Sequence, residues 1–312
     1  MMRRTLLITA VVSAALHGDL HGQTPPPART TLWVTLGDID ELVEVDPYTF
    51  KEIDRTGDLA VIDTRRRVEI GRVHVGNDPN QITLTRDGRF AYVPLRDDNE
   101  IAVVELNPLR VVKKLPVAKG PHDAYTSDDG SRIYVGAQFG NGIIAIDPAA
   151  QSVLYTIPTA DGVRPLAIAP DGKTVYAALS HLIGFVVADP ATHKVTRTVE
   201  LATIPPGVPE PYLATFTHSL MLSPDAKELW VTDCVNYLIR IVRLSDMREI
   251  SQIRVGKFPH WFAMRADGQS GVREPLGFGR HRRHRRREPE GAHERPVHPG
   301  TGPKRIMVAS KQ

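Results

Sequence analysis

The chain has 312 residues, 41% of them hydrophobic and 24% charged, which is typical of a folded globular protein and argues against a disordered chain. The formal net charge is +3, but residues 280–287 hold six arginines, so the rest of the chain carries 3 − 6 = −3. A general basic surface for nucleic acid is therefore not expected. The only cysteine, Cys234, excludes an internal disulfide and falls just after a predicted strand, near a surface.

The N-terminal residues 1–22 have the pattern of a secretory signal. Arg3 and Arg4 precede an uncharged, mostly apolar stretch, 5–16, that is too short to span a bilayer. Cleavage is expected between Ala15 and Gln23, and a short membrane anchor is the less favoured alternative. Residues 23–30 then form a Pro-rich linker. We expect a periplasmic, secreted or cell-surface protein without a membrane span in the mature chain.

A fragment of sequence returns every 42 residues. Tyr92, Tyr134 and Tyr176 are spaced by this period, and an apolar run ending in an acid follows each tyrosine, 13 residues later. An Asp-Gly pair precedes each tyrosine. Several short strands in a period of roughly 40–45 residues are typical of propeller blades. The repeat therefore predicts an all-β fold, a β-propeller, as a single domain over residues 31–310, and we expect a monomer.

Each repeat is expected to hold four strands, a to d, and the blades can be counted on that basis. Full repeats begin near residues 79, 121, 165, 217 and 259, the third being longer by 12 residues in a Pro- and Gly-rich loop at 202–213. The N-terminal segment 33–50 and the C-terminal segment 302–310 together predict one shared blade that closes the ring. The acids Asp46 and Asp63 are only 17 apart, which predicts a truncated blade. A seven-bladed plan with one thin blade is expected, and six blades remain the alternative.

Three segments carry a resemblance to a known family. Residues 89–93 (RFAYV), 131–135 (SRIYV) and 222–232 (LSPDAKELWVT) resemble the YVTN-type β-propeller repeat family. The resemblance implies exported or cell-surface propellers of varied role. The asparagine of that repeat is replaced here, for example by Leu95 and Ala137, and fold similarity by itself carries no function.

Residues 270–299 have the length of the missing strands of the last blade but not their chemistry. They contain the arginine run, and the repeat resumes in register at Pro303. Codons can be chosen for 271–287 so that reading one base later gives AYVSPSGSDATVAIDAA, with the missing aromatic-Val and Ile-Asp. This favours a compensated frame shift. A genuine basic segment that binds a polyanion and a solvated loop are the alternatives, and nucleic acid is not an expected partner.

Strand a of each repeat is expected to line the centre of the ring. Most repeats begin with a proline, which we call the marker proline. The residues that follow the marker proline, or its equivalent, in successive blades are therefore expected to form a ring around that centre. Three histidines, His122, His218 and His260, fall at this position. The other members are Lys304, Asn80 and Leu166. The b-to-c loops on the same face add His181 and Asp233, and Trp261 is placed to stack on a ligand. The predicted ligand-binding set is Asn80, His122, His181, His218, Asp233, His260, Trp261 and Lys304.

The three histidines have three interpretations. Together with nearby carboxylates they have the chemistry to bind a divalent metal or a haem-type group, since neutral imidazole suits zinc, copper and iron. One of them alternatively acts as a general acid or base or contacts a ligand without metal. A repeated structural motif, in which each histidine hydrogen-bonds backbone, is the third.

The sequence predicts a binding scaffold. It would present the predicted ligand-binding set, as a funnel at one face of the propeller, to a small molecule or a protein partner. The alternative is a metal- or cofactor-dependent enzyme, an oxidoreductase or a lactonase- or lyase-like activity, that uses the same residues. A decaying gene is a third interpretation, because the truncated and the scrambled blade are independent lesions. The identity of a ligand does not follow from the residues.

Overall fold

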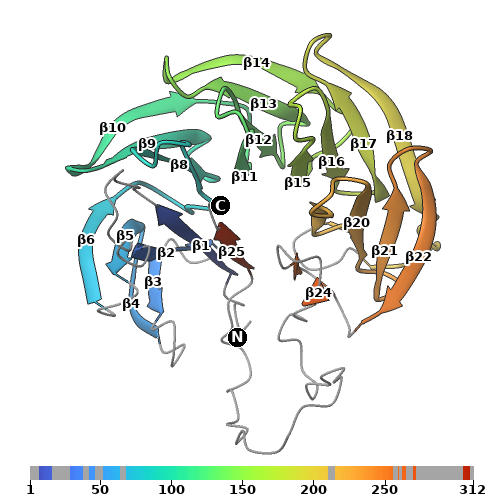
Figure 1. Ribbon diagram of the computed structural model, residues 1–312, viewed down its shortest axis with the longest axis horizontal. Helices are drawn as coiled ribbons and strands as arrows, with labels where there is room; N and C mark the ends of the chain where they lie inside the picture. The colour runs from blue at the N-terminus through green and yellow to red at the C-terminus, as the bar shows by residue number, and fades with distance from the viewer. Residues whose placement is uncertain are drawn as a thin grey trace, which may run out of the picture.

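The computed structural model describes residues 7–15, 29–37, 42–45, 52–63, 68–209, 215–255, 259, 262–264, 270–271 and 305–309. All the regular elements among them are β-strands. They form sheets arranged around a common centre, with β11 and β15 toward the middle and β10, β14, β18 and β22 at the rim (Figure 1). The fold is a β-propeller, as the repeat predicted.

Four sheets of four antiparallel strands correspond to the clear repeats. The first contains β7 (Thr83–Leu84), β8 (Phe90–Leu95), β9 (Glu100–Leu106) and β10 (Leu109–Pro116). The second contains β11 (Pro121–Thr126), β12 (Ile133–Ala137), β13 (Gly142–Asp147) and β14 (Ser152–Pro158). The third contains β15 (Val163–Ile168), β16 (Val175–Leu179), β17 (Ile183–Asp189) and β18 (Lys194–Ala202). The fourth contains β19 (Leu220–Leu222), β20 (Glu228–Asp233), β21 (Leu238–Arg243) and β22 (Arg248–Arg254).

The Asp-Gly pairs form the turns between the first two strands of a blade. Gly88, Gly130 and Gly172 have φ of 69°, 73° and 69°, a conformation that glycine adopts without strain. The aspartate of each pair accepts a hydrogen bond from the backbone two residues on, for example from Ser131 N to Asp129 Oδ1 at 2.9 Å. These residues therefore have a structural role in the turn, and candidate ligand-binding residues lie at other positions.

The hydrophobic core lies between successive blades. Alternate residues of a strand face opposite neighbours: Ile144 and Ile146 of β13 pack with Tyr92 of the preceding blade, whereas Ile143 packs with Val175 of the next one. Tyr92 is fully buried and donates its hydroxyl hydrogen to Pro148 O, at 3.1 Å in the following blade. The repeated tyrosine is thus a core residue, and at Tyr92 it joins two blades.

The N-terminal blade differs from the prediction. Its sheet has the order β25-β1-β2-β5-β6, from β1 (Leu7–Ala15), β2 (Arg29–Gly37), β5 (Asp58–Asp63), β6 (Val68–His74) and β25 (Arg305–Ala309). The strands β3 (Leu42–Val45) and β4 (Glu52–Thr56) form a separate hairpin between β2 and β5. The expected shared blade and truncated blade are therefore one sheet with an inserted hairpin. Asp46 follows β3, which belongs to the hairpin, whereas β5 ends at Asp63 and pairs with β2 in the blade. The 17-residue spacing between these two acids is therefore not a distance between two blades.

The two ends of the chain meet in this sheet, although not as predicted. The C-terminal β25 pairs in parallel with β1, and β1 pairs antiparallel with β2. Residues within the predicted signal thus lie between the two strands that were expected to pair directly. The β-branched residues Ile8, Thr9, Val11 and Val12 suit a strand. Removal of a signal peptide stays a prediction.

At the other end of the ring, β23 (Ala263–Met264) and β24 (Ser270–Gly271) form a two-stranded sheet. Of the proposed frame-shifted segment 270–299, residues 272–299, which hold the arginine run, lie outside the described residues. The described sheets are five of four or five strands with two further pairs, so a seven-blade count stays a prediction. Within the ranges given above, no helix has the length and apolar character needed to cross a bilayer.

Candidate functional site

The equivalent positions in successive blades follow from the strand register. Pro121 at the start of β11 pairs with Ala137, and Val163 at the start of β15 pairs with Leu179, the last residue of the neighbouring strand in each case. The residue after Pro121 is His122, and the residue after Val163 is Arg164. The predicted ring member Leu166 is wrong: it is two residues further along and is buried in the core between blades.

The same register identifies the other members of the ring. Pro79 bridges to Leu95 at the end of β8, which makes the next residue, Asn80, equivalent to His122. Leu220 pairs with Val231 as Ala124 pairs with Val135, and this makes His218 equivalent to His122 as well. Four adjacent blades therefore contribute, in order, Asn80, His122, Arg164 and His218.

Arg164 joins the two histidines. Its Nη1 lies 3.0 Å from Nε2 of His218, and its Nη2 contacts Nε2 of His122. All three side chains are about 1% exposed. We call these three residues the Arg164 cluster. Three successive blades thus bring one guanidinium and two imidazoles together in a site closed to solvent.

The protonation of the cluster follows from its hydrogen bonds. A guanidinium only donates, so both Nε2 atoms accept and carry no proton. Nδ1 of His122 is then the protonated nitrogen and donates to Asp123 Oδ1 at 3.0 Å. Burial, reinforced by the charge of Arg164, lowers the pKa of His122 from 6.5 to about 4, against the opposing effect of Asp123. His122 is therefore a neutral imidazole at pH 7.

Two glycines let the backbone of Arg164 reach this position. A Cβ on Gly136 of β12 would lie 2.6 Å from Arg164 O, and one on Gly162 would lie 1.8 Å from Gln138 O. Neither space admits a side chain. The close approach of β15 to β12 thus depends on glycine at both positions.

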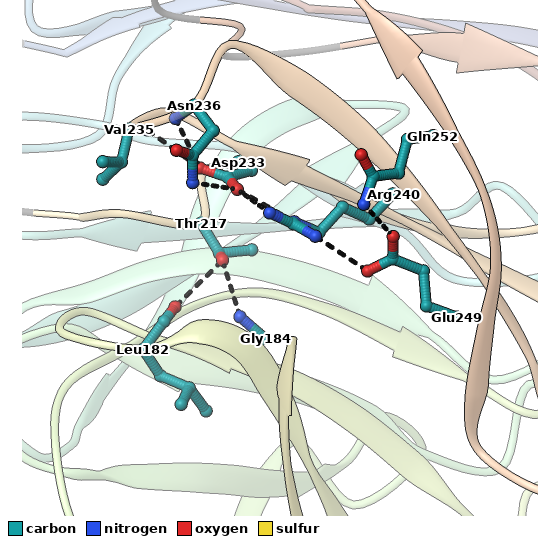
Figure 2. A network of polar contacts seen from close by, with 9 residues as sticks. All are labelled: Leu182, Gly184, Thr217, Asp233, Val235, Asn236, Arg240, Glu249 and Gln252. Atoms are coloured by element: carbon teal, nitrogen blue, oxygen red, sulfur yellow. Dashed lines mark hydrogen bonds and ion pairs between the residues drawn. The ribbon is translucent and has the colours of Figure 1, made fainter. Parts of the chain in front are cut away.

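His218 is held by its neighbours in the chain. Its backbone N donates to Thr232 Oγ1 at 2.9 Å. The preceding residue, Thr217, donates its hydroxyl to Leu182 O and accepts from Gly184 N in the previous blade (Figure 2). Because these bonds cross between two blades, they fix the start of β19 against the blade that supplies Arg164.

An ion pair between Arg96 and Asp78 lies near His122. Arg96 Nε contacts Asp78 Oδ2, and both side chains are largely buried. The charge of Arg96 also lowers the pKa of His122, as the weakest of the effects on that residue. The surroundings of the cluster are therefore polar and charged, in contrast to the apolar core between blades.

Some buried polar atoms have no hydrogen-bond partner among the described residues. They include Gln81 Nε2, Thr215 Oγ1 and Ser219 Oγ. Gln81 and Ser219 directly follow the ring residues Asn80 and His218. An unsatisfied buried polar group costs about 1–3 kcal/mol, so a bound water or ligand is expected at such atoms.

Asp233, a predicted ligand residue, serves its own blade instead. Oδ1 accepts from the backbone of Val235 and Asn236, and Oδ2 accepts from Arg240 Nε at 2.8 Å (Figure 2). Arg240 also bonds Glu249 Oε2 on β22 at 2.8 Å. This ion network ties β20, β21 and β22 together. It gives Asp233 a structural role that accounts for its complete burial.

His181 contacts the loop before β15. Its side chain is half exposed, and its Nδ1 lies 2.7 Å from Asp161 Oδ2. The imidazole packs against Phe216, with ring centroids 6.1 Å apart.

The remaining predicted residues, His260, Trp261 and Lys304, lie outside the described residues, so the three-histidine site stays a prediction. Within the described part of the chain, no three His, Cys, Asp or Glu side chains are grouped as a metal site requires. Cys234 is buried, which corrects the expected surface position, and its thiol contacts Pro259 O at 3.3 Å. Burial raises the pKa of Cys234 to about 12.

Arg164 was missed because the marker proline shifts by two residues in this one blade. The signal was present: counting from the tyrosines, 122 + 42 = 164, and the 12-residue insertion gives 164 + 54 = 218. Asp123 was missed as well. Nothing in its repeat position indicates that it orients a histidine next to it in the chain.

No family model matches the chain, and neither does any curated protein. Among solved structures, the chain is similar to Kuenenia stuttgartiensis hydrazine synthase, with 22% identity and a TM-score of 0.61 over 76% of this chain and 68% of that one. It is also similar to the dihydro-haem d1 dehydrogenase NirN in complex with DHE, with 20% identity and a TM-score of 0.51. That match covers 65% of this chain and only 42% of NirN. At these identities the likeness shows the fold alone.

Proposed function

We propose that this chain is an exported propeller that binds a small molecule at the Arg164 cluster. The observation that carries the proposal is the convergence of His122, Arg164 and His218 from three successive blades. Polar side chains are costly to bury, and a repeat fold closes well with apolar residues at these positions. Ligand sites hold a few precisely placed polar groups, and His122 and Arg164 lie on β11 and β15, the strands toward the middle of the ring (Figure 1).

The unsatisfied donors beside the ring support the same proposal. Gln81 and Ser219 follow ring residues and keep polar atoms without a partner among the described residues. A small molecule seated there would supply the missing hydrogen bonds. A protein partner is the less favoured ligand, because the cluster is closed to solvent and a protein would contact exposed side chains.

The experiment is a thermal-shift screen of the purified protein with anionic, neutral and cationic small molecules at constant ionic strength. The proposal expects at least one class to raise the melting temperature saturably in the wild type. The shift is lost in His218→Leu and kept in His193→Asn, whose exposed histidine lies on the outer face of a blade. A shift that survives in His218→Leu, or no shift with any class, contradicts the proposal.

An enzyme that uses the same cluster is the second candidate. The hydrogen bond from His122 to Asp123 favours it, because a carboxylate-oriented imidazole is the usual arrangement of a general base or a metal ligand. The two solved neighbours are also named as enzymes. However, the Nε2 atom that either role requires accepts from Arg164, and the guanidinium repels a metal cation. Binding is therefore placed first, and metal content with visible absorbance of the purified protein tests the alternative.

A further inference from the structure

We infer that the ligand of this site carries an oxyanion group, a carboxylate or a phosphate, that binds against the guanidinium of Arg164. The inference rests on the proposed ligand site and names the chemical class that it takes. A guanidinium is permanently charged and its planar array of donors matches the oxygens of these groups. Few other side chains select so strongly for one ligand chemistry.

The imidazoles hold the guanidinium without changing its charge. His122 and His218 each accept from one terminal nitrogen of Arg164 through an unprotonated Nε2. Both contacts therefore come from neutral rings, which orient the guanidinium plane at pH 7 and leave the cation intact. Nδ1 of His122 donates to Asp123 Oδ1 at 3.0 Å, and this bond orients the ring that contacts Arg164.

Three buried polar atoms can donate hydrogen bonds. Gln81 Nε2 has only N–H groups to offer, whereas the hydroxyls of Ser219 and Thr215 can donate or accept. All three residues are about 1% exposed or less. The Gln81 amide in particular favours an acceptor-rich ligand such as an oxyanion. This observation is independent of Arg164.

Burial sets the size and the strength of the interaction. Because water is largely excluded from the cluster, charge-assisted hydrogen bonds are stronger there than at the surface. The same burial restricts access to the cluster to a small group. The anionic end of the ligand is expected at the cluster, with the rest of the molecule outside it.

The test measures binding of acetate, succinate and inorganic phosphate by thermal shift at pH 7. Glycerol and tetramethylammonium serve as the neutral and cationic probes, and sodium chloride keeps the ionic strength constant. We expect saturable stabilisation by at least one of the three anions and none by the cation. Acetate or succinate alone identifies a carboxylate ligand, and phosphate alone identifies a phosphate.

Two variants examine the role of Arg164. Arg164→Met is expected to weaken anion binding about tenfold or more, which corresponds to about 1.4 kcal/mol. Arg164→Lys keeps the charge but not the planar donor array, so it tests the inference if the methionine variant does not fold. An intermediate loss is expected for it. The matched control, Arg197→Met on the exposed face of β18, should bind as the wild type does.

The outcomes separate the two proposals. Saturable binding of the neutral or cationic probe, lost in His218→Leu, with no anion binding would overturn the anion class and keep the ligand site. No binding by any probe would overturn both. Anion binding that is unchanged in Arg164→Met and Arg164→Lys would place the anion elsewhere and overturn the inference.

Discussion

Arg164 Nη1 lies 3.0 Å from Nε2 of His218, although the two residues are 54 positions apart in the chain. The spacing is one 42-residue repeat plus the 12-residue insertion after β18. Residues at equivalent positions of neighbouring blades thus meet at the centre of the ring. The position of each side chain in the Arg164 cluster therefore depends on its contacts with the others.

The stability of the protein should fall between pH 6.5 and about 4 because of His122. The pKa of this group is lowered to about 4 in the folded protein, whereas it is near 6.5 when unfolded. Across that window the unfolded chain binds the proton more readily, so stability is full above pH 6.5 and is lost as the pH falls. Comparing urea denaturation at pH 7 and 4.5, the wild type should lose roughly 2–3 kcal/mol more than His122→Gln. Equal losses in both proteins would contradict the neutral, buried imidazole.

A methyl group at Gly162 should destabilise the fold and disturb the cluster. The new Cβ would lie 1.8 Å from Gln138 O, so the loop before β15 must move. Overpacking of this kind costs about 1–3 kcal/mol. Gly162→Ala should lower the denaturation midpoint and shift the imidazole NMR signals of His122 and His218. Gly172→Asn is the control, since it lies in open space and asparagine tolerates its φ of +69°.

Removing Asp233 should cost stability but leave ligand binding unchanged. Asp233→Ala removes one of the two carboxylates that pair with the buried Arg240 and leaves Glu249, and breaking a buried pair costs about 3–5 kcal/mol. The double variant Asp233→Ala with Arg240→Met should be less destabilised than the sum of the single variants, as chemical denaturation can measure. Simple additivity would show that the pair does not interact.

The thiol of Cys234 should not react while the protein is folded. It is about 2% exposed, and burial raises its pKa to about 12, so almost no thiolate is present at pH 8. Ellman's reagent should modify it only on unfolding, in step with loss of near-UV circular dichroism. Rapid modification of the native protein would contradict the burial.

Export should shorten the chain at its N-terminus. If the signal is cleaved between Ala15 and Gln23, the secreted protein lacks the β1 strand and β25 must find a new partner, for which the exposed edge of β2 is available. Intact-mass measurement of the exported protein gives the cleavage position. A mass that includes residue 1 would indicate that β1 stays in the sheet and that the signal prediction is wrong.

The blade architecture could be predicted because it depends on local patterns. The 42-residue period, the Asp-Gly turns at Gly88 and Gly130, and the buried tyrosines all follow from residues within one repeat. The N-terminal blade could not be predicted in the same way. Its pairing of β2 with β5 skips a hairpin, and only long-range contacts decide between that partner and the nearer strand β3.

By itself, the sequence determined that the chain folds as a ring of repeated antiparallel sheets, and that His122 and His218 occupy equivalent positions in two of them. The tertiary structure decided that Arg164 stands between them and that Asp233 is bound to Arg240. A repeat specifies which positions are equivalent, because each blade uses the same local hydrogen bonds. It does not specify which side chains touch at the centre, because those contacts depend on the approach of one backbone to another at Gly136 and Gly162.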